Sequence, residues 1–437
     1  MNPLIRTPLL FAVMAAMLAV VGFGQSWQVA LTILNLCLIS AIMALGLNIQ
    51  WGYAGLFNVG VMGFAAVGGL ATVLISKAPV GDAWAAGGGR LAIAAGVLLA
   101  TAAVVVVARR WLGPGPIRAL AMAVIVIAGY FLTRVFFDPA TEAIEAVNSA
   151  KTGYLGGLGL PIILSWIVGG LLAAGVAWFI GKVALGLRSD YFAIATLGIS
   201  EIVIAVLKNE DWLARGVKNV TGLKRPVPYE LDLQADPWFA DFAAWFGSDV
   251  VEASSIVVKL CYAVLFLIVL QIVVALSERA LKSPWGRMMR AIRDNEDAAE
   301  AMGKDVTRRH LQIFIIGSAV IGIAGAMLVT LDGQFTPGTY QPLRFTFLIW
   351  IMVIIGGSGN NWGSVLGGFL VWFVWIEAEP TGLWLMDVIT SGLAEGSPLR
   401  THLLEVAPHM RLVIMGVILL LVMRFAPRGL IPEIIRR

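Results

Sequence analysis

Long apolar segments recur along the whole chain and are separated by short polar stretches. Each is about as long as a helix that crosses a hydrocarbon layer roughly 30 Å thick. The pattern predicts an all-α fold, in which residues 1–437 form one polytopic bundle with about ten full transmembrane spans. The spans lie near 8–24, 27–50, 55–76, 91–108, 119–137, 159–181, 190–207, 255–277, 309–331 and 411–425. No small-x-small cleavage site precedes Gln25, so the first segment is interpreted as a retained span rather than a signal peptide.

A further apolar stretch, 345–377, is broken by the glycine-rich run 356–363. Its halves, 345–356 and 362–377, would extend only about 18 and 24 Å as helices. We expect a broken pair of short helices packed inside the bundle. Irregular backbone at membrane depth often lines a substrate path. A tight hairpin between close-packed helices explains the pattern equally well.

The composition agrees with a membrane protein. Of the 437 residues 59% are hydrophobic and 13% are charged, which argues against a soluble globular fold. The net charge of +4 fits basic cytoplasmic loops. A nucleic-acid partner is not indicated, because no basic patch with interleaved aromatic residues occurs. Cys37 and Cys261 lie in apolar segments and are interpreted as buried packing residues.

Lysine and arginine fall on one side of the predicted bundle when the spans are counted from the N-terminus. Basic loops face the cytoplasm, so this side is predicted to be cytoplasmic, together with both termini. The strongly charged run 278–310 lies on it. The opposite, periplasmic side receives two longer segments, 208–254 and 378–410.

The run 278–310 contains eight Lys or Arg and six Asp or Glu within 33 residues. As a helix it would place an apolar stripe on one side and its charges toward water. The stripe comprises Met288, Met289, Ile292, Ala298, Ala299 and Met302. Gly303 fits as the residue that ends the helix. A loop that only sets topology needs basic residues alone, so the mixture of acids and bases favours a docking element over an ordinary surface helix.

Few polar residues occur inside the predicted spans. Glu201 lies near the middle of its span, close to Thr196 and Ser200, and should be paired, protonated or exposed to a water-filled path. Asn48 and Asn58 flank a short loop before a glycine-rich span. Hydrogen bonding and close helix packing are the alternatives to lining a path. The sequence contains no P-loop, no metal-ligand spacing and no nucleophile–base pair, so neither an enzyme nor a cofactor or metal site is expected.

Asp297-Ala298-Ala299, followed after three residues by Gly303, resembles the EAA loop of ABC importer permeases, with Asp in place of Glu. The longer run 286–303 resembles, more narrowly, branched-chain amino acid permeases of the LivM type, within the LivH/LivM family. Other matching stretches are 52–60, 187–198 with Glu201, 356–363 and 427–430.

The resemblance implies an inner-membrane permease subunit that pairs with a second permease. Two cytoplasmic ATP-binding subunits and a periplasmic solute-binding protein would complete the importer. The implied ATPase-coupling residues are Gly286, Arg290, Arg293, Asp294, Asn295, Glu296, Asp297, Ala298, Ala299 and Gly303. The candidate translocation path comprises Asn48, Tyr53, Asn58, Thr196, Glu201 and Asn360.

The implied substrates are branched-chain or other apolar amino acids, although relatives that carry urea or short amides share these motifs. A secondary transporter or channel without ATPases is the alternative, and it would show an inverted repeat and paired intramembrane charges. The segments 91–108 and 119–137 look additional to the family core and are interpreted as an extra helical hairpin over 91–137. The segments 208–254 and 378–410 also depart from the family pattern. We expect 286–303 to form a short helix outside the bilayer, on the side of both termini.

Overall fold

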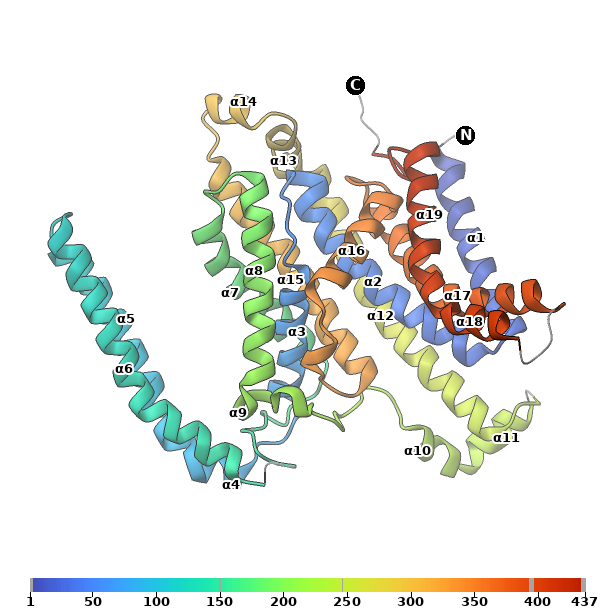
Figure 1. The fold of residues 1–437 in the computed structure, drawn as a ribbon, viewed down its shortest axis with the longest axis horizontal. Coiled ribbons are helices and arrows are strands. Elements are labelled where there is room, and N and C mark those ends of the chain that lie inside the picture. The colour runs from blue at the N-terminus through green and yellow to red at the C-terminus, as the bar shows by residue number, and fades with distance from the viewer. Residues whose placement is uncertain (1–2, 149–150, 246, 393–396, 434–437) are drawn as a thin grey trace.

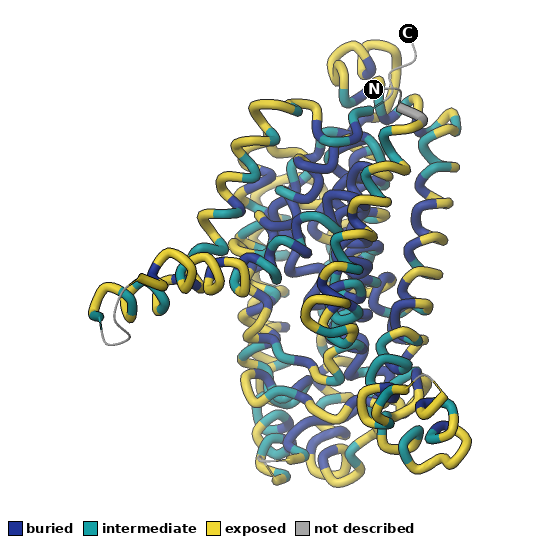
Figure 2. The backbone as a smooth tube through the Cα atoms, turned by 90° about the vertical axis from the view of Figure 1, so that its right-hand side faces the viewer, coloured by how far each residue is buried: buried dark blue, intermediate teal, exposed yellow. Residues whose placement is uncertain are grey.

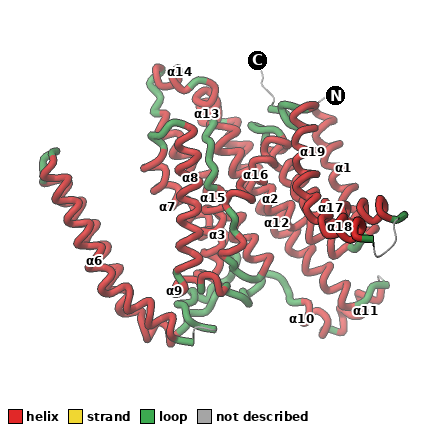
Figure 3. Tube along the Cα trace, viewed as in Figure 1, coloured by secondary structure: helices red, strands yellow, loops and turns green. Residues whose placement is uncertain are grey.

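The computed structural model describes residues 3–148, 151–245, 247–392 and 397–433. Residue 246 and residues 393–396, within the two segments predicted to be periplasmic, lie outside the described residues. Over the described ranges the chain forms helices and loops, with two isolated β-bridges and no longer strand (Figure 3). The predicted all-α class is therefore confirmed.

Nine helical segments in the described ranges are long and apolar enough to cross a membrane, which confirms a polytopic bundle. Seven of these segments are α1 (Pro3–Gly24), α2 (Trp27–Ala54), α6 (Pro116–Ala146), α7 (Leu164–Ala184), α8 (Ser189–Asn209), α12 (Val250–Lys282) and α15 (Val306–Asp332). The other two are Gly81–Trp111, which ends in α5 (Gly89–Trp111), and Pro398–Phe425, which ends in α19 (Met410–Phe425). The helix α17 (Asn361–Thr390) is also long but is not among the nine. The shorter helices are α3 (Val61–Ser76), α4 (Gly81–Ala83), α9 (Asp211–Ala214), α10 (Glu230–Ala235), α11 (Pro237–Trp245), α13 (Pro284–Asp294), α14 (Glu296–Ala301), α16 (Pro342–Gly356) and α18 (Pro398–Val406).

The predicted span 55–76 is wrong at its start. Gly55 adopts a left-handed conformation with φ of 70° and ends α2, and α3 begins only at Val61. The residues between them are not helical, although Leu56, Asn58 and Val59 are buried. The irregular backbone that was expected near 356–363 is therefore present here as well.

Of the two short helices predicted over 345–377, only the first is short in the structure. α16 is short, with 15 residues, but α17 runs for 30 residues instead of ending near 377. The helix continues past Glu377 and Glu379, where the apolar stretch ends, and both acids have partners there. Gln25 donates a 2.8 Å hydrogen bond to Glu377, and Arg411 forms an ion pair with Glu379.

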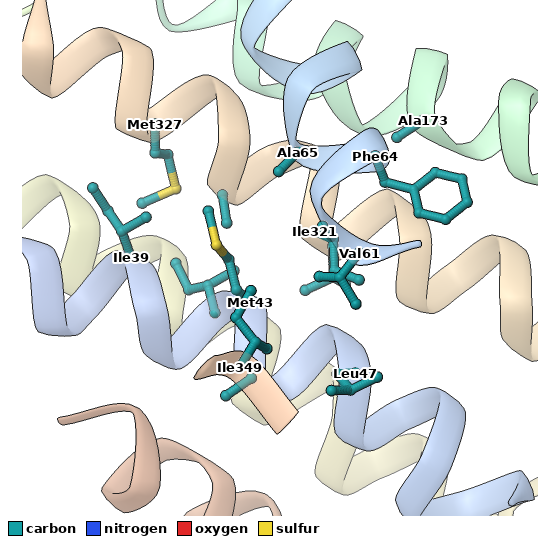
Figure 4. Close-up of a cluster of buried hydrophobic side chains, with 14 of the residues drawn as sticks. Ile39, Met43, Leu47, Val61, Phe64, Ala65, Ala173, Ile321, Met327 and Ile349 are labelled. Atoms are coloured by element: carbon teal, nitrogen blue, oxygen red, sulfur yellow. The ribbon is translucent and has the colours of Figure 1, made fainter. Parts of the chain in front are cut away.

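The core lies where α2, α3, α7, α15 and α16 meet (Figure 4). Buried residues are concentrated along the middle of the bundle (Figure 2). Glycines bring the α3 and α15 backbones into near contact: a Cβ on Gly68 would lie 1.9 Å from the Gly322 carbonyl oxygen. Small residues of this kind allow helices to pack closely inside a membrane.

The helices α5 and α6 pair as a hairpin that leans away from the other helices (Figure 1). Most of their apolar side chains are exposed. At the base of the hairpin, the backbone N–H of Trp212 donates to Glu145 at 3.2 Å. This contact ties the hairpin to the segment that follows α8.

The two ends of the bundle differ. At one end, which we call the α13 end, lie α13, α14, the first turns of α1 and the last turns of α19 (Figure 1). At the opposite end lie α4, α9, α10 and α11. The structure thus brings the charged segment to the same end as the beginning of α1 and the end of α19.

Candidate coupling and translocation site

The charged segment forms two short helices joined by a cap rather than the single helix expected from its sequence. Ser283 caps α13, its Oγ accepting from the Gly286 N–H at 3.3 Å, and Pro284 occupies the first turn. Asn295 interrupts the helix because its side chain accepts from the Ala298 N–H at 2.9 Å and begins α14. Gly303, with φ of 76°, follows α14.

Gly286 lies at the sharp corner between α12 and α13. A Cβ there would lie 2.4 Å from the Leu281 carbonyl oxygen, so no other residue fits this corner without rearrangement. The corner fixes the direction in which α13 leaves the bundle.

The apolar stripe agrees only in part with the prediction. Met289, Ile292 and Ala299 are buried, but Ala298 is exposed and Met302 is 80% exposed. The break at Asn295 rotates the second helix, which turns Met302 outward.

The charges divide between two surfaces. Asp294, Glu296 and Asp297 are exposed, as predicted for residues that face water. Arg290 and Arg293 were also expected to face water, yet both are half-buried on the inner side of α13. Arg293 donates to the Gly52 carbonyl and, at 2.9 Å, to Glu433, so it fixes α13 to α2 and to the last described residue of the chain.

A polar cluster beneath α13 joins α2, α12 and the turn before α17. Asn361 donates to Glu278 at 2.9 Å and accepts from the Tyr53 hydroxyl, and Asn48 accepts from the Gly359 N–H at 2.8 Å. Asn48, Tyr53 and Asn361 are all fully buried. The glycine-rich turn therefore lies at the α13 end of the bundle and not at its middle.

Asn360 points away from this cluster. Its Oδ1 accepts from the Trp362 and Gly363 N–H groups at 3.0 and 3.2 Å, and its Nδ2 donates to the Pro432 carbonyl. Asn360 therefore caps α17 and binds the segment after α19 at Pro432, and its place in a translocation path stays a prediction.

A second buried cluster satisfies the irregular backbone before α3. Asn58 donates to Gln50 at 2.8 Å and accepts from the Gly60 N–H at 2.8 Å, while Gln50 donates to Ser318 at 3.0 Å. Thr196 of α8 accepts from the Val59 N–H at 3.1 Å. Buried backbone groups need such partners inside a membrane, so Asn58 and Thr196 stabilise this turn.

Replacing Asn58 by alanine is expected to lower the free energy of unfolding by about 3 kcal/mol, since it leaves the Gln50 side-chain carbonyl and the Gly60 N–H buried without these partners. A thermal unfolding curve of the detergent-solubilised protein measures this. The matched control is Asn209→Ala, because Asn209 is exposed and donates only within its own helix, at 2.7 Å to Ala205. Equal shifts for both variants would show that the cluster does not stabilise the turn.

Glu201 lies apart from both clusters. It was expected to be paired, protonated or exposed to a water-filled path, and in the structure it is exposed and lines a groove of about 720 Å³ between α8, α16 and α19. The groove is otherwise mostly apolar, with Lys208 and Arg344 as further charged residues. Within the part of the chain that the structure describes, Glu201 forms no ion pair.

Arg344 is held against the groove wall by an aromatic contact. Its guanidinium carbon lies 4.9 Å from the centre of the Trp375 ring, and that of Arg411 lies 5.0 Å from the same ring. Such contacts keep a cation oriented without neutralising it.

Five residues whose side chains these clusters use were not among the predicted site residues: Gln50, Glu278, Ser318, Asn361 and Glu433. Glu278 lies in the charged run 278–310 and Asn361 lies in the glycine-rich run 356–363. The signal that could have identified them is a polar side chain next to a long apolar segment. Glu433 carried no such signal, because its partner Arg293 lies 140 residues away in the sequence.

The model of a family described as "Branched-chain amino acid transport system / permease component" matches residues 117–423. No solved structure matches the chain at a significant level.

The curated relatives are transport permeases. The chain is 30% identical over 232 residues to the high-affinity branched-chain amino acid transport system permease protein LivM of Escherichia coli K12, covering 52% of this chain and 53% of that protein. It is 26% identical over 394 residues to the probable LivM of Methanocaldococcus jannaschii, covering 90% of each. It is also 25% identical over 219 residues to the probable LivH of that organism, covering 49% of this chain and 60% of LivH. The chain thus spans about half the length of the E. coli relative and nine-tenths of the archaeal one.

Proposed function

Because this chain belongs to the family of permease components of branched-chain amino acid transport systems, we propose that it is one membrane subunit of an ABC importer. A second, related permease completes the membrane unit, in line with the similarity to both LivM and LivH proteins. Two ATP-binding subunits drive transport, and a periplasmic binding protein delivers the solute. The chain lies in a bacterial inner membrane with its α13 end toward the cytoplasm.

The observation that carries this proposal is the two-sided construction of α13 and α14. Their outer surface is exposed and acidic, with Glu296, Asp297 and Glu300 on α14. Their inner surface is fixed to the bundle by buried Met289 and Ile292 and by Arg293. A surface helix that an ATPase moves needs both an accessible side and a firm connection to the spans.

The groove that contains Glu201 is the proposed portion of the translocation path on this subunit. Glu201 and Arg344 are exposed and Lys208 is half-buried on a membrane-spanning surface, where an unpaired charge needs water, solute or another subunit as partner. Covering by the second permease would convert the open groove into a channel between the two. An apolar wall with both signs of charge suits a zwitterionic amino acid with an apolar side chain, as the names of the relatives suggest.

Replacing Glu201 by glutamine is expected to lower ATP-driven uptake of leucine by about tenfold, since a hydrogen bond from an ammonium to a carboxylate is lost. The measurement is uptake into proteoliposomes that contain both permeases and both ATPases and receive the binding protein outside. Glu252→Gln is the matched control, because Glu252 is an equally exposed acid in the first turn of α12 and does not line the groove.

Wild-type uptake for both variants would exclude Glu201 from the path while leaving the importer assignment intact. Absence of ATP-dependent uptake by the wild-type complex, with leucine, urea or short amides alike, would contradict the assignment itself. Uptake without any ATPase would favour a secondary transporter or channel.

A further inference from the structure

The segment after α19 turns back and packs against the turn between α16 and α17. The Leu430 and Ile431 N–H groups donate to the carbonyls of Ile355 and Gly356, each at 2.8 Å. Asn360 donates to the Pro432 carbonyl at 3.1 Å. Three hydrogen bonds therefore join residues 430–432 to the end of α16 and the start of α17.

Glycines make this contact very close. A Cβ on Gly357 would lie 2.3 Å from the Ile431 carbonyl oxygen, and a Cβ on Gly429 would lie 2.3 Å from the Gly357 Cα. The two backbones thus pack directly on each other, and a movement of one displaces the other.

The same segment ends in an ion pair with α13. The Glu433 carboxylate lies 2.9 Å from the Arg293 guanidinium and 3.8 Å from that of Arg290, and its side chain is only 15% exposed. Two cations of α13 therefore converge on one carboxylate. A charge-assisted contact of this kind, partly shielded from water, is stronger than a surface ion pair.

We propose that residues 428–433 act as a latch that carries the movement of α13 to the α16–α17 turn, with Glu433 as the positioning residue. The inference rests on the proposed function, in which the ATPases move α13. α13 packs mainly against α2 and α12, and the latch gives it a connection to α16. Because α16 supplies Phe347, Leu348 and Ile351 to the groove wall, a displaced α16 changes the groove.

The test is Glu433→Gln in the complete importer, with ATP hydrolysis and leucine uptake measured in the same proteoliposomes. Uptake per ATP hydrolysed is expected to fall by about fivefold or more, the lower range of couplings between distant sites. The ATPases should still co-purify and hydrolyse ATP at the wild-type rate. Glu405→Gln is the control, because Glu405 is exposed on α18 and, among the residues that the structure describes, forms no ion pair with α13.

If the wild-type importer is active and Glu433→Gln takes up as much leucine per ATP hydrolysed as the wild type does, the latch is overturned and the proposed function still stands. Parallel losses of ATPase binding, hydrolysis and uptake would also overturn it, because they indicate a structural role alone. An inactive wild-type importer would instead contradict the proposed function. Glu433→Asp keeps the charge but withdraws the carboxylate by one methylene. Its ratio of leucine uptake to ATP hydrolysed should therefore fall between those of the wild type and Glu433→Gln. If Glu433→Gln does not assemble, the ratio of Glu433→Asp decides, and a wild-type value there would overturn the latch.

Discussion

Replacement of Gly325 by valine is expected to abolish recovery of folded protein. Gly325 lies on α15 against α3, and a Cβ there would fall 2.0 Å from the Ala65 carbonyl oxygen. The atoms in the way are backbone, and α3 is buried along nearly its whole length, so neither helix has room to move. Forced separation of two packed helices destabilises by about 3 kcal/mol or more. The measurement is size-exclusion chromatography of the detergent-solubilised chain, which should show aggregated instead of monodisperse protein.

Gly175→Val is the matched control. Gly175 lies on the neighbouring helix α7, and nothing lies within 4 Å of the position that its Cβ would occupy. The helix propensity changes in the same way in both variants, because each replaces a glycine inside a helix by valine. Equal behaviour of the two variants would show that α3 and α15 are not in the contact described.

The membrane-spanning helices could be predicted from the sequence because each needs a long apolar segment. The boundaries that failed depend on contacts between distant residues. α17 continues past Glu377, Glu379 and Pro380 because Gln25 and Arg411 supply partners that local sequence does not reveal. α3 begins late because the non-helical residues before it have buried partners on two other helices: Asn58 donates to Gln50 of α2, and the Val59 N–H donates to Thr196 of α8.

For the candidate site, the sequence predicted where the charged helices lie but not the long-range contacts that their residues make. The charged run identified α13 and α14, since no other part of the chain mixes acids and bases so densely. Sequence could not reveal that Arg293 turns inward, because its partners Gly52 and Glu433 are remote along the chain. For Glu201 the sequence left pairing, protonation and exposure open, because it does not reveal that α8, α16 and α19 leave a groove beside this residue.

Replacement of Asp297 by arginine is expected to release the ATPases. Asp297 is exposed on α14 and, within the described residues, forms no ion pair, so the fold should not depend on it. A bulky side chain of opposite charge at the centre of a docking surface should lower the amount of bound ATPase by about tenfold or more. Asp232→Arg is the matched control, because Asp232 is an exposed acid on α10 at the opposite end of the bundle.

The most direct test of ATPase docking on α13 and α14 is the amount of ATPase that the affinity-tagged chain retains in detergent when all subunits are expressed together. The wild-type chain and Asp232→Arg should retain it equally, and Asp297→Arg should retain little while eluting as folded protein. Equal retention by all three chains would show that the ATPases bind elsewhere, and no retention by the wild-type chain would contradict the importer assignment.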